Sequence, residues 1–299
     1  MKKKILILTS DPLSINYEII KKSIFFFNKQ NKNDYIFVGC KKDFIKNTKL
    51  NKTNLNFINI EKSSSIKSYL KNCFEVSFNL LQNKKAHGLI NLPLNKKFLP
   101  KKYPGFTEYI ADYFNLKNQE TMLLYNQNFS VSPNTTHLLL KHVSKKLNFE
   151  TINKNILNIN FFFKKIIGIK TPRLGLMGLN PHNGIDFKNT TEENKILIPA
   201  LKYNQKRGIK ILGLLSPDFA FLTMKEKKIN CLVGNYHDQV LPIFKFINKF
   251  KAINITLGLP FLRISPDHGT AIDIKGKNKA NPESFLYALN FFEKYFNKI

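Results

Sequence analysis

The sequence contains no tryptophan, few cysteines and no long apolar run. Cys40, Cys73 and Cys231 are odd in number and far apart, which excludes a disulfide framework and a CxxC metal site and favours a reducing compartment. No run approaches the ~18 apolar residues that a membrane span needs. The apolar segment Ile5–Thr9 follows a basic N-terminus, but it is shorter than a signal peptide requires and meets Asp11-Pro12 at once. We therefore expect a cytoplasmic protein without a membrane partner, and a first strand at Ile5–Thr9.

Arginine is scarce as well, although the chain is strongly basic. Its 48 lysines and arginines against 20 acidic residues give a formal net charge of +28, but only Arg173, Arg207 and Arg263 are arginines. A nucleic-acid binder is expected to use more arginine, which matches phosphates and base edges better than lysine does. The lysines are dispersed, and the abundant residues (Asn, Ile, Phe and Lys) have A/T-rich codons. We expect no nucleic-acid partner, although the charge would attract an anionic substrate. A steep salt dependence of RNA affinity would favour the alternative.

The hydrophobic pattern is that of an α/β protein, and the chain lacks the G-x-G-x-x-G fingerprint of the Rossmann fold. Strand candidates are Ile5–Thr9, Tyr35–Val38, Leu55–Ile58, Gly88–Asn91, Met122–Tyr125, Leu174–Gly178, Ile211–Leu215, Cys231–Val233 and Ile253–Leu257. Helix candidates are Ile15–Phe27, Ser65–Leu81, Thr107–Phe114, His137–Leu147, Glu192–Tyr203 and a last helix that Asn281 can cap, with Pro282 in its first turn. This alternation predicts a mainly parallel sheet with helices on both faces. The Lys41–Lys52 stretch is interpreted as a solvated surface segment.

Histidines follow several of the predicted strands. In parallel sheets, ligands bind where the strands reach their carboxyl edge. His182 follows the strand Leu174–Gly178, His237 follows Cys231–Val233, and His137 is expected at a helix start. Three neutral imidazoles with an open coordination position suit a catalytic metal ion. The separations match no short metal motif, so solvated loop histidines remain the alternative.

The segment from Ile253 to Pro282 is rich in glycine and proline and predicts a rigid polar loop. Lys245, Asn254 and Arg263 could converge on a phosphate or carboxylate through charge-assisted hydrogen bonds. The alternative, an ordinary surface cation, is stronger for Lys245 than for Arg263, which stands between an apolar strand and a Gly/Pro turn.

Together these strings resemble one enzyme family. GLNPH at 178–182, YHDQ at 236–239, NITLGLPF-x-R at 254–263 and DHGTA at 267–271 are similar, in order and interval, to the 4-hydroxythreonine-4-phosphate dehydrogenases, and the likeness extends weakly over nearly the whole chain. DHGTA and the stretch that follows also resemble the loop that holds adenosine in isopropylmalate and isocitrate dehydrogenases. The resemblance implies an isopropylmalate-dehydrogenase-like α/β fold with two lobes, 1–129 plus 255–299 for cofactor and substrate, and 130–254 for metal binding and dimerisation.

The resemblance also implies a set of site residues. The divalent metal (Zn, Mg, Mn or Co) would be held by His137, His182 and His237, with the site completed across a homodimer interface. The substrate would be held by Thr107, Lys245, Asn254 and Arg263. Asp218 and Asp238 would be catalytic partners near the metal. NAD would be held by His268, Gly269, Thr270, Asp273 and Asn281.

The implied reaction is NAD-dependent oxidation of 4-(phosphohydroxy)-L-threonine, followed by decarboxylation to 3-amino-2-oxopropyl phosphate in vitamin B6 biosynthesis. The chain departs from the family pattern in its N-terminal half. The GHTE motif has Phe106 in place of histidine, the TGP-x-x-K loop reads Asn91-Leu-Pro-Leu-Asn-Lys96, and the glycine-rich first loop reads Ser10 to Tyr17. Relaxed selection with catalysis retained, a paralogue for another phosphorylated hydroxy acid, and an inactive homologue that binds NAD and metal all remain open.

Overall fold

The computed structural model describes residues 2–9, 11–50, 55–187 and 191–296. The chain forms two compact units: unit 1 comprises Met1–Asn115, Phe250–Ile255 and Leu259–Ile299, and unit 2 comprises Leu116–Lys249 and Thr256–Gly258. The predicted lobes differ from these units mainly at residues 116–129, which belong to unit 2. The roles that the resemblance gives to the lobes remain predictions.

The sheet of unit 1 is parallel. Its strands follow the order β3-β2-β1-β4-β11. They are β1 (Lys4–Leu8), β2 (Asp34–Gly39), β3 (Asn56–Asn59), β4 (Gly88–Asn91) and β11 (Leu262–Pro266); β10 (Ile253–Leu257) is divided between the two units. Apart from β11, these strands were predicted. The neighbouring pair β4 and β11 bears on function, because β4 ends at Asn91 and β11 carries Arg263.

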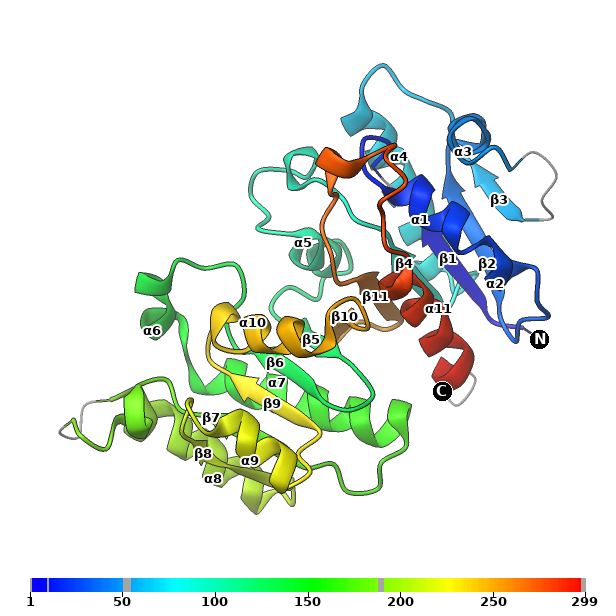
Figure 1. The fold of residues 1–299 in the computed structure, drawn as a ribbon. Helices are drawn as coiled ribbons and strands as arrows, with labels where there is room; N and C mark the ends of the chain where they lie inside the picture. Colours follow the sequence, from blue (N-terminus) through cyan, green and yellow to red (C-terminus); the bar gives the residue numbers. More distant parts are fainter. Residues whose placement is uncertain (1, 10, 51–54, 188–190, 297–299) are drawn as a thin grey trace. The chain divides into compact units, whose positions relative to one another are not determined.

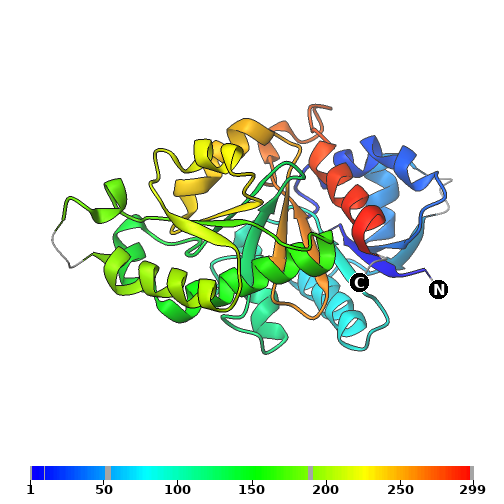
Figure 2. The same cartoon turned by 90° about the horizontal axis from the view of Figure 1, so that it is seen from below.

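Helices cover both faces of this sheet (Figures 1 and 2). They are α1 (Asn16–Lys22), α2 (Ile24–Phe27), α3 (Lys41–Thr48), α4 (Ile66–Gln82), η1 (Lys96–Phe98), α5 (Phe106–Tyr113), η6 (Ile272–Ile274) and α11 (Glu283–Tyr295). Successive residues of a strand face opposite sides, so Leu6 and Leu8 pack into the core cluster under α4 and α5. On the other face, Phe37 contacts Phe27 of α2, which in turn contacts Phe285 of α11.

One expectation for unit 1 is corrected. The helix predicted over Ile15–Phe27 is interrupted at Ser23 and forms α1 and α2. The stretch interpreted as a solvated surface segment, Lys41–Lys52, forms α3, whose lysines are exposed; its residues 51 and 52 lie outside the described residues. Phe44 explains the helix, because its ring is buried against those of Phe37 and Phe57 despite the lysines around it.

Unit 2 has a mixed sheet in the order β5-β6-β9-β7-β8. Its strands are β5 (Thr121–Tyr125), β6 (Ser130–Pro133), β7 (Leu174–Met177), β8 (Ile211–Leu215) and β9 (Cys231–Gly234). The β5–β6 pair is antiparallel, and β6, β9, β7 and β8 run parallel to one another. The fold class predicted from the sequence, α/β with a mainly parallel sheet flanked by helices, is confirmed.

The helices of unit 2 are η2 (Leu140–His142), α6 (Val143–Lys146), α7 (Phe149–Phe161), η3 (Phe162–Ile167), η4 (Pro181–Gly184), η5 (Glu193–Leu197), α8 (Ile198–Lys206), α9 (Ala220–Glu226) and α10 (His237–Asn248). Helices α9 and α10 cover one face of the sheet, and α7 and α8 lie side by side on the other (Figures 1 and 2). No helix in the described parts of the chain combines the length and apolar character that crossing a membrane requires.

The helix predicted over His137–Leu147 is wrong. His137 lies in a loop, and only the short η2 and α6 form after it. The segment lacks the buried apolar stripe that would stabilise a longer helix. Leu139 and Leu140 are 64% and 69% exposed, and within the predicted helix only Val143 and Leu147 are buried.

Candidate active site

The parallel strands of unit 2 bring the predicted metal-binding residues to one edge of the sheet. His137 follows β6, His237 follows β9, His182 follows β7, and Asp218 follows β8. These four strands are neighbours, in that order. Because the carboxyl ends of parallel strands meet at one edge, segments that are distant in the sequence share the place where such sheets bind ligands.

Two of the three imidazoles lie next to each other. The ring centroids of His137 and His237 are 6.0 Å apart, with 42° between the ring planes. A metal lies about 2 Å from a ligating ring nitrogen, so two imidazole centroids on one ion are at most about 6 Å apart. The pair is therefore within the range for a shared ion. Among the described residues, no group of three or more His, Cys, Asp or Glu side chains already surrounds one point.

Carboxylates orient two of the histidine rings. Nδ1 of His182 lies 2.7 Å from Oδ2 of Asp186, and Nδ1 of His237 lies 3.1 Å from Oδ1 of Asp238. Each contact leaves Nε2 for another partner. Metal-ligating histidines commonly hold their second ring nitrogen in this way, which fixes the tautomer and the ring orientation. The donor set thus fits a divalent metal, and Asp238 orients its neighbour.

Asp218 is exposed at the end of β8, where the Ser216 hydroxyl donates to its Oδ1 at 2.5 Å. That hydrogen bond is the main reason why the pKa of Asp218 is below its ordinary value, and the nearby charge of His182 lowers it further. Asp218 is therefore an ionised carboxylate in the neighbourhood of His182.

The loop that carries His182 is anchored by a buried glutamate. Oε1 of Glu193 accepts the backbone N–H groups of Leu179 and Asn180 at 2.8 and 2.7 Å, and its Oε2 accepts the Asn180 side chain at 2.8 Å. Burial alone would raise the pKa of Glu193, but these hydrogen bonds outweigh it and lower the pKa below its ordinary value. The loop needs such support because His182 and Asn183 adopt left-handed backbone conformations, with φ of 49° and 58°.

We expect Glu193→Gln to destabilise the fold by roughly 2–3 kcal/mol at pH 7, because charge-assisted hydrogen bonds to buried amides are lost. A carboxyl whose folded-state pKa is lowered contributes stability above its unfolded pKa, and this contribution disappears as the pH falls through the folded value. The difference between wild type and variant in urea unfolding should therefore shrink between pH 7 and pH 3. Glu150→Gln, at an exposed position on α7, should leave stability unchanged. An equal loss at both pH values would contradict the role of the carboxylate.

The loops of His137 and His237 are joined through Asn235, which is fully buried. Its carbonyl accepts the Thr135 hydroxyl at 2.7 Å, and its side chain donates to the carbonyl of Met177 at 2.9 Å. Gln239 adds a bond to the carbonyl of Gly178 at 2.8 Å. The three histidine-bearing loops are thus tied together by buried amides.

Unit 1 contains the second predicted cluster, around Arg263. This side chain is only 3% exposed, and it lies within β11 rather than in a loop. Its Nε donates to Oδ1 of Asn91 at 2.5 Å, and its Nη1 donates to the hydroxyl of Thr107 at 3.2 Å. Burial lowers the pKa of Arg263 to about 10, while the Glu108 carboxylate opposes that shift. Arg263 and Thr107, both predicted to bind the substrate, are therefore in contact, and the Arg263 guanidinium is a buried cation.

The other two predicted substrate-binding residues, Asn254 and Lys245, lie on other elements than Arg263 and Thr107. Asn254 lies on β10 in unit 1, and its side-chain oxygen is buried without a hydrogen-bond partner among the described residues. A buried amide oxygen of this kind can accept a hydrogen bond from a ligand. Lys245 is exposed on α10 in unit 2.

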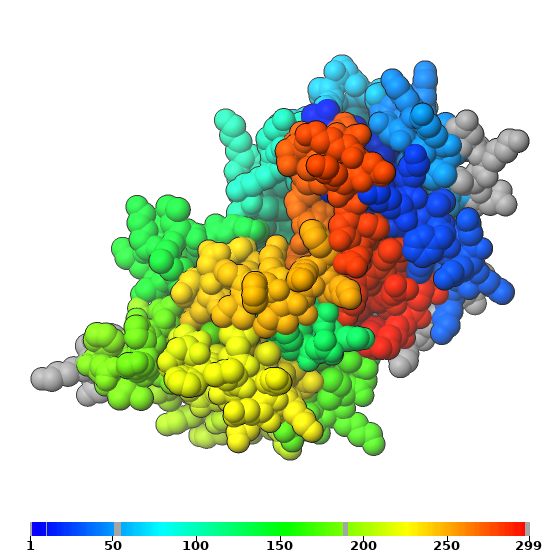
Figure 3. Space-filling model, in the orientation of Figure 1, coloured from blue at the N-terminus to red at the C-terminus, as the bar shows by residue number. Residues whose placement is uncertain are grey.

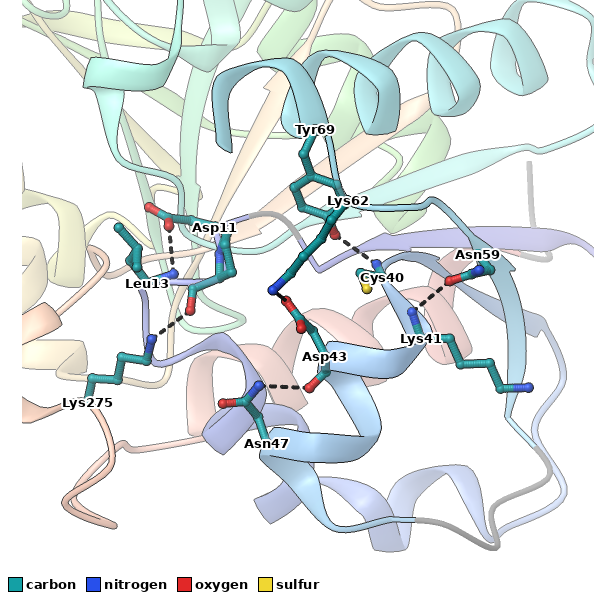
Figure 4. A network of polar contacts seen from close by, with 11 residues as sticks. Asp11, Leu13, Cys40, Lys41, Asp43, Asn47, Asn59, Lys62, Tyr69 and Lys275 are labelled. Atoms are coloured by element: carbon teal, nitrogen blue, oxygen red, sulfur yellow. Dashed lines mark hydrogen bonds and ion pairs between the residues drawn. The ribbon is translucent and has the colours of Figure 1, made fainter. Parts of the chain in front are cut away.

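The predicted cofactor residues lie on an exposed segment of unit 1 (orange in Figure 3). Gly269 and Asp273 are exposed, while His268 and Thr270 are half-buried. The segment is held against the first loop of the chain: the N–H of Ile15 donates to the carbonyl of Thr270 at 3.2 Å, and Lys275 donates to the carbonyl of Pro12 at 2.7 Å (Figure 4).

Asn281 bonds to the start of α11, as predicted, by accepting the N–H of Glu283 at 2.8 Å. The helix begins at Glu283, so Pro282 occupies the capping position rather than the first turn. The two N-terminal loops that depart from the family pattern are hydrogen-bonded to each other. Asn16 donates to the carbonyls of Thr9 and Pro93, and Asp11 accepts the N–H of Asn95. Ser10 lies outside the described residues.

Sequence reasoning missed four residues that shape these clusters: Asn91, Phe106, Glu193 and Asn235. Asn91 and Phe106 were noted only as departures from a motif, although they contact Arg263. Asn235 directly precedes the YHDQ string, and polar residues next to a predicted ligand are the available signal for such supports. Glu193 lies outside every quoted motif and offered no comparable signal.

Comparisons with known proteins identify the family and the fold. The family model described as "Pyridoxal phosphate biosynthetic protein PdxA" matches residues 4–292. A protein of Sulfurihydrogenibium named 4-hydroxythreonine-4-phosphate dehydrogenase is 37% identical, with 96% of each chain covered. The crystal structure of the Klebsiella pneumoniae protein of that name is similar with a TM-score of 0.80 and 27% identity, covering 97% of this chain and 98% of that one. An isocitrate dehydrogenase from Methylococcus capsulatus shares the fold at a TM-score of 0.53 and 12% identity, covering 97% and 85% of the two chains.

Proposed function

Because the chain belongs to the PdxA family of pyridoxal phosphate biosynthetic proteins, we propose that it oxidises 4-(phosphohydroxy)-L-threonine with NAD and a divalent metal. The observation that carries this proposal is the position of His137, His182 and His237 at the carboxyl ends of neighbouring parallel strands. In this reaction NAD⁺ would accept the hydride from C3, the hydroxyl proton would be released, and the resulting β-keto acid would lose CO₂ and take up a proton at C2 to give 3-amino-2-oxopropyl phosphate.

Each group has a distinct task in this proposal. The metal, when bound by the three histidines, supplies Lewis-acid stabilisation of negative charge on the substrate oxygen. NAD accepts the hydride, so the protein binds and orients. Arg263 and Thr107 hold an anionic group of the substrate, with Lys245 as a further donor, and Asn254 accepts a hydrogen bond from the substrate through its side-chain oxygen. Asp238 orients His237, and the ionised Asp218 is a polar partner near the metal. His268, Gly269, Thr270, Asp273 and Asn281 hold NAD.

A homodimer completes the proposed site. Large apolar side chains are exposed close in sequence to the histidines: Leu139 and Leu140 follow His137, Ile185 follows His182, and Phe246 is 83% exposed on the helix that begins at His237. Exposed apolar side chains of this kind are typical of interaction surfaces. The proposed partner is a second copy of the chain. A measurement of the molar mass in solution tests this dimer. The proposed compartment is the cytoplasm.

The first test is NADH formation, followed at 340 nm, from 4-(phosphohydroxy)-L-threonine and NAD⁺. We expect turnover with added Zn²⁺, Mg²⁺, Mn²⁺ or Co²⁺ and its loss after treatment with a chelator, because the proposed chemistry depends on the metal. Isothermal titration on the same preparation reports NAD and metal binding independently.

No turnover by a protein that binds both NAD and metal would contradict the substrate assignment. It would favour the second candidate, a paralogue for another phosphorylated hydroxy acid. The observation that favours this candidate is that Asn91 and Phe106, which both depart from the family pattern, contact Arg263.

A further inference from the structure

Two of the departures from the family pattern meet at one retained residue. Asn91 is the last residue of β4, and Phe106 is the first residue of α5. Both contact the side chain of Arg263 on β11. The two positions are separated along the chain by a loop and η1, so their meeting at a single buried guanidinium is a property of the fold.

The contacts hold the guanidinium from different directions. Hydrogen bonds to Asn91 and Thr107 lie along its donor edge, at 2.5 and 3.2 Å. Phe106 lies against its face, with the guanidinium carbon 5.3 Å from the ring centroid, which is a cation–π contact. An arginine that is bonded along its edge and covered on its face has few alternative rotamers, so its direction is set before a ligand arrives.

Phe106 is itself immobile enough to act as a platform. It is 9% exposed and belongs to the core cluster of unit 1. Its ring centroid lies 5.3 Å from that of Phe74, 6.2 Å from that of Phe78 and 6.1 Å from that of Tyr109. The cluster fixes the ring on the sides away from Arg263. An imidazole here would put polar nitrogens among these aromatic rings and, when protonated, a second positive charge beside the guanidinium.

We propose that Phe106 and Asn91 are positioning residues for Arg263, which they hold in the orientation that receives the anionic group of the substrate. In this chain the ring of Phe106 stands where the family motif has a histidine. Recognition of the anionic group then depends on Arg263, which this ring contacts. The assignment of Arg263 to the substrate rests on the proposed function, whereas the support of Arg263 by Phe106 and Asn91 does not.

The test compares Phe106→Leu with Phe106→Tyr and with Phe37→Leu, using the full-length protein. Phe106→Leu removes the aromatic face and should raise KM for 4-(phosphohydroxy)-L-threonine about tenfold, with kcat within about twofold, because a desolvated cation–π contact is lost. Phe106→Tyr keeps the face and should stay within about threefold of wild-type KM. Phe37→Leu removes a fully buried ring of the same unit that packs against Phe27, Phe44 and Phe57, so it should lower Tm without changing KM.

Equal KM values for Phe106→Leu and Phe37→Leu would overturn the proposal. If the wild-type protein does not turn over this substrate, the proposed function fails separately, and the positioning role is measured through the affinity for inorganic phosphate, from the dependence of Tm on phosphate concentration. The proposal then requires weaker phosphate binding by Phe106→Leu and unchanged binding by Phe37→Leu. The same phosphate affinity in both variants would refute it.

Discussion

Arg263→Met should lower kcat/KM for 4-(phosphohydroxy)-L-threonine by about 10³-fold and should also lower the free energy of unfolding, by roughly 3–5 kcal/mol. The guanidinium is buried, and its lowered pKa reflects the cost of holding a cation away from water. Removing it alone leaves the side-chain oxygen of Asn91 and the Glu108 carboxylate without their cationic partner, which costs more than the relief of that burial. Loss of a charge-assisted contact to a bound anion costs about 2–5 kcal/mol, which corresponds to the expected loss of activity.

Steady-state kinetics and urea unfolding of the same variant test this pair of outcomes. Arg173→Met is the matched control, because Arg173 is exposed and its guanidinium donates to the carbonyl of Lys227. The control should keep its activity. Unchanged kcat/KM of the folded Arg263→Met protein would remove Arg263 from the substrate site, and unchanged stability would show that Asn91 and Glu108 do not depend on its charge.

His237→Ala should weaken divalent-metal binding by about 100-fold or more and abolish metal-dependent NADH formation. Removal of one of three imidazoles leaves too few ligands for a catalytic ion, and even second-shell changes cost 10–100-fold. Metal affinity can be measured with Co²⁺ or Zn²⁺ against a chromophoric chelator, which gives a readout apart from activity.

His142→Ala serves as the control for this experiment. His142 is exposed at the end of η2 and lies outside the proposed ligand set. It belongs to the same unit as His237, so the comparison separates loss of a ligand from loss of any histidine. If the two variants bind the metal equally well, His237 is not a ligand, and turnover that resists chelation would remove the metal from the reaction.

The parts of the fold that the sequence predicted are those with strong local signals. Gly88–Asn91, Ile211–Leu215 and Ile253–Leu257 were predicted with the bounds that the structure has. Each is a short apolar run bounded by polar or turn-forming residues, which is a pattern typical of strands. The helix α4 was also predicted to within one residue, and its cap confirms the reason, because the Ser65 side chain accepts the N–H of Ser68.

The elements that were missed lack such signals. β6 (Ser130–Pro133) has two serines and a proline among its 4 residues, and β11 contains Arg263 in its interior. Both strands are buried along their whole length. Polar side chains on them bond to other strands: the Ser132 hydroxyl donates to the carbonyl of Met122, and Arg263 donates to Asn91. α10 has Pro242 within it and was not predicted, although its apolar residues have helical spacing. In each case tertiary partners overrule the local preference.

By itself, the sequence determined the chemistry available to this protein and its family: the histidine-bearing loops, the single arginine in the Gly/Pro-rich segment, and the motifs that match the PdxA proteins. Only the tertiary structure decided which groups act on one another. The Arg263–Asn91 hydrogen bond joins residues 172 positions apart, and Asn235 reaches Met177 across 58 positions. Strand order creates such contacts, and it is set by burial and hydrogen bonding summed over the whole sheet, which no local stretch of sequence encodes.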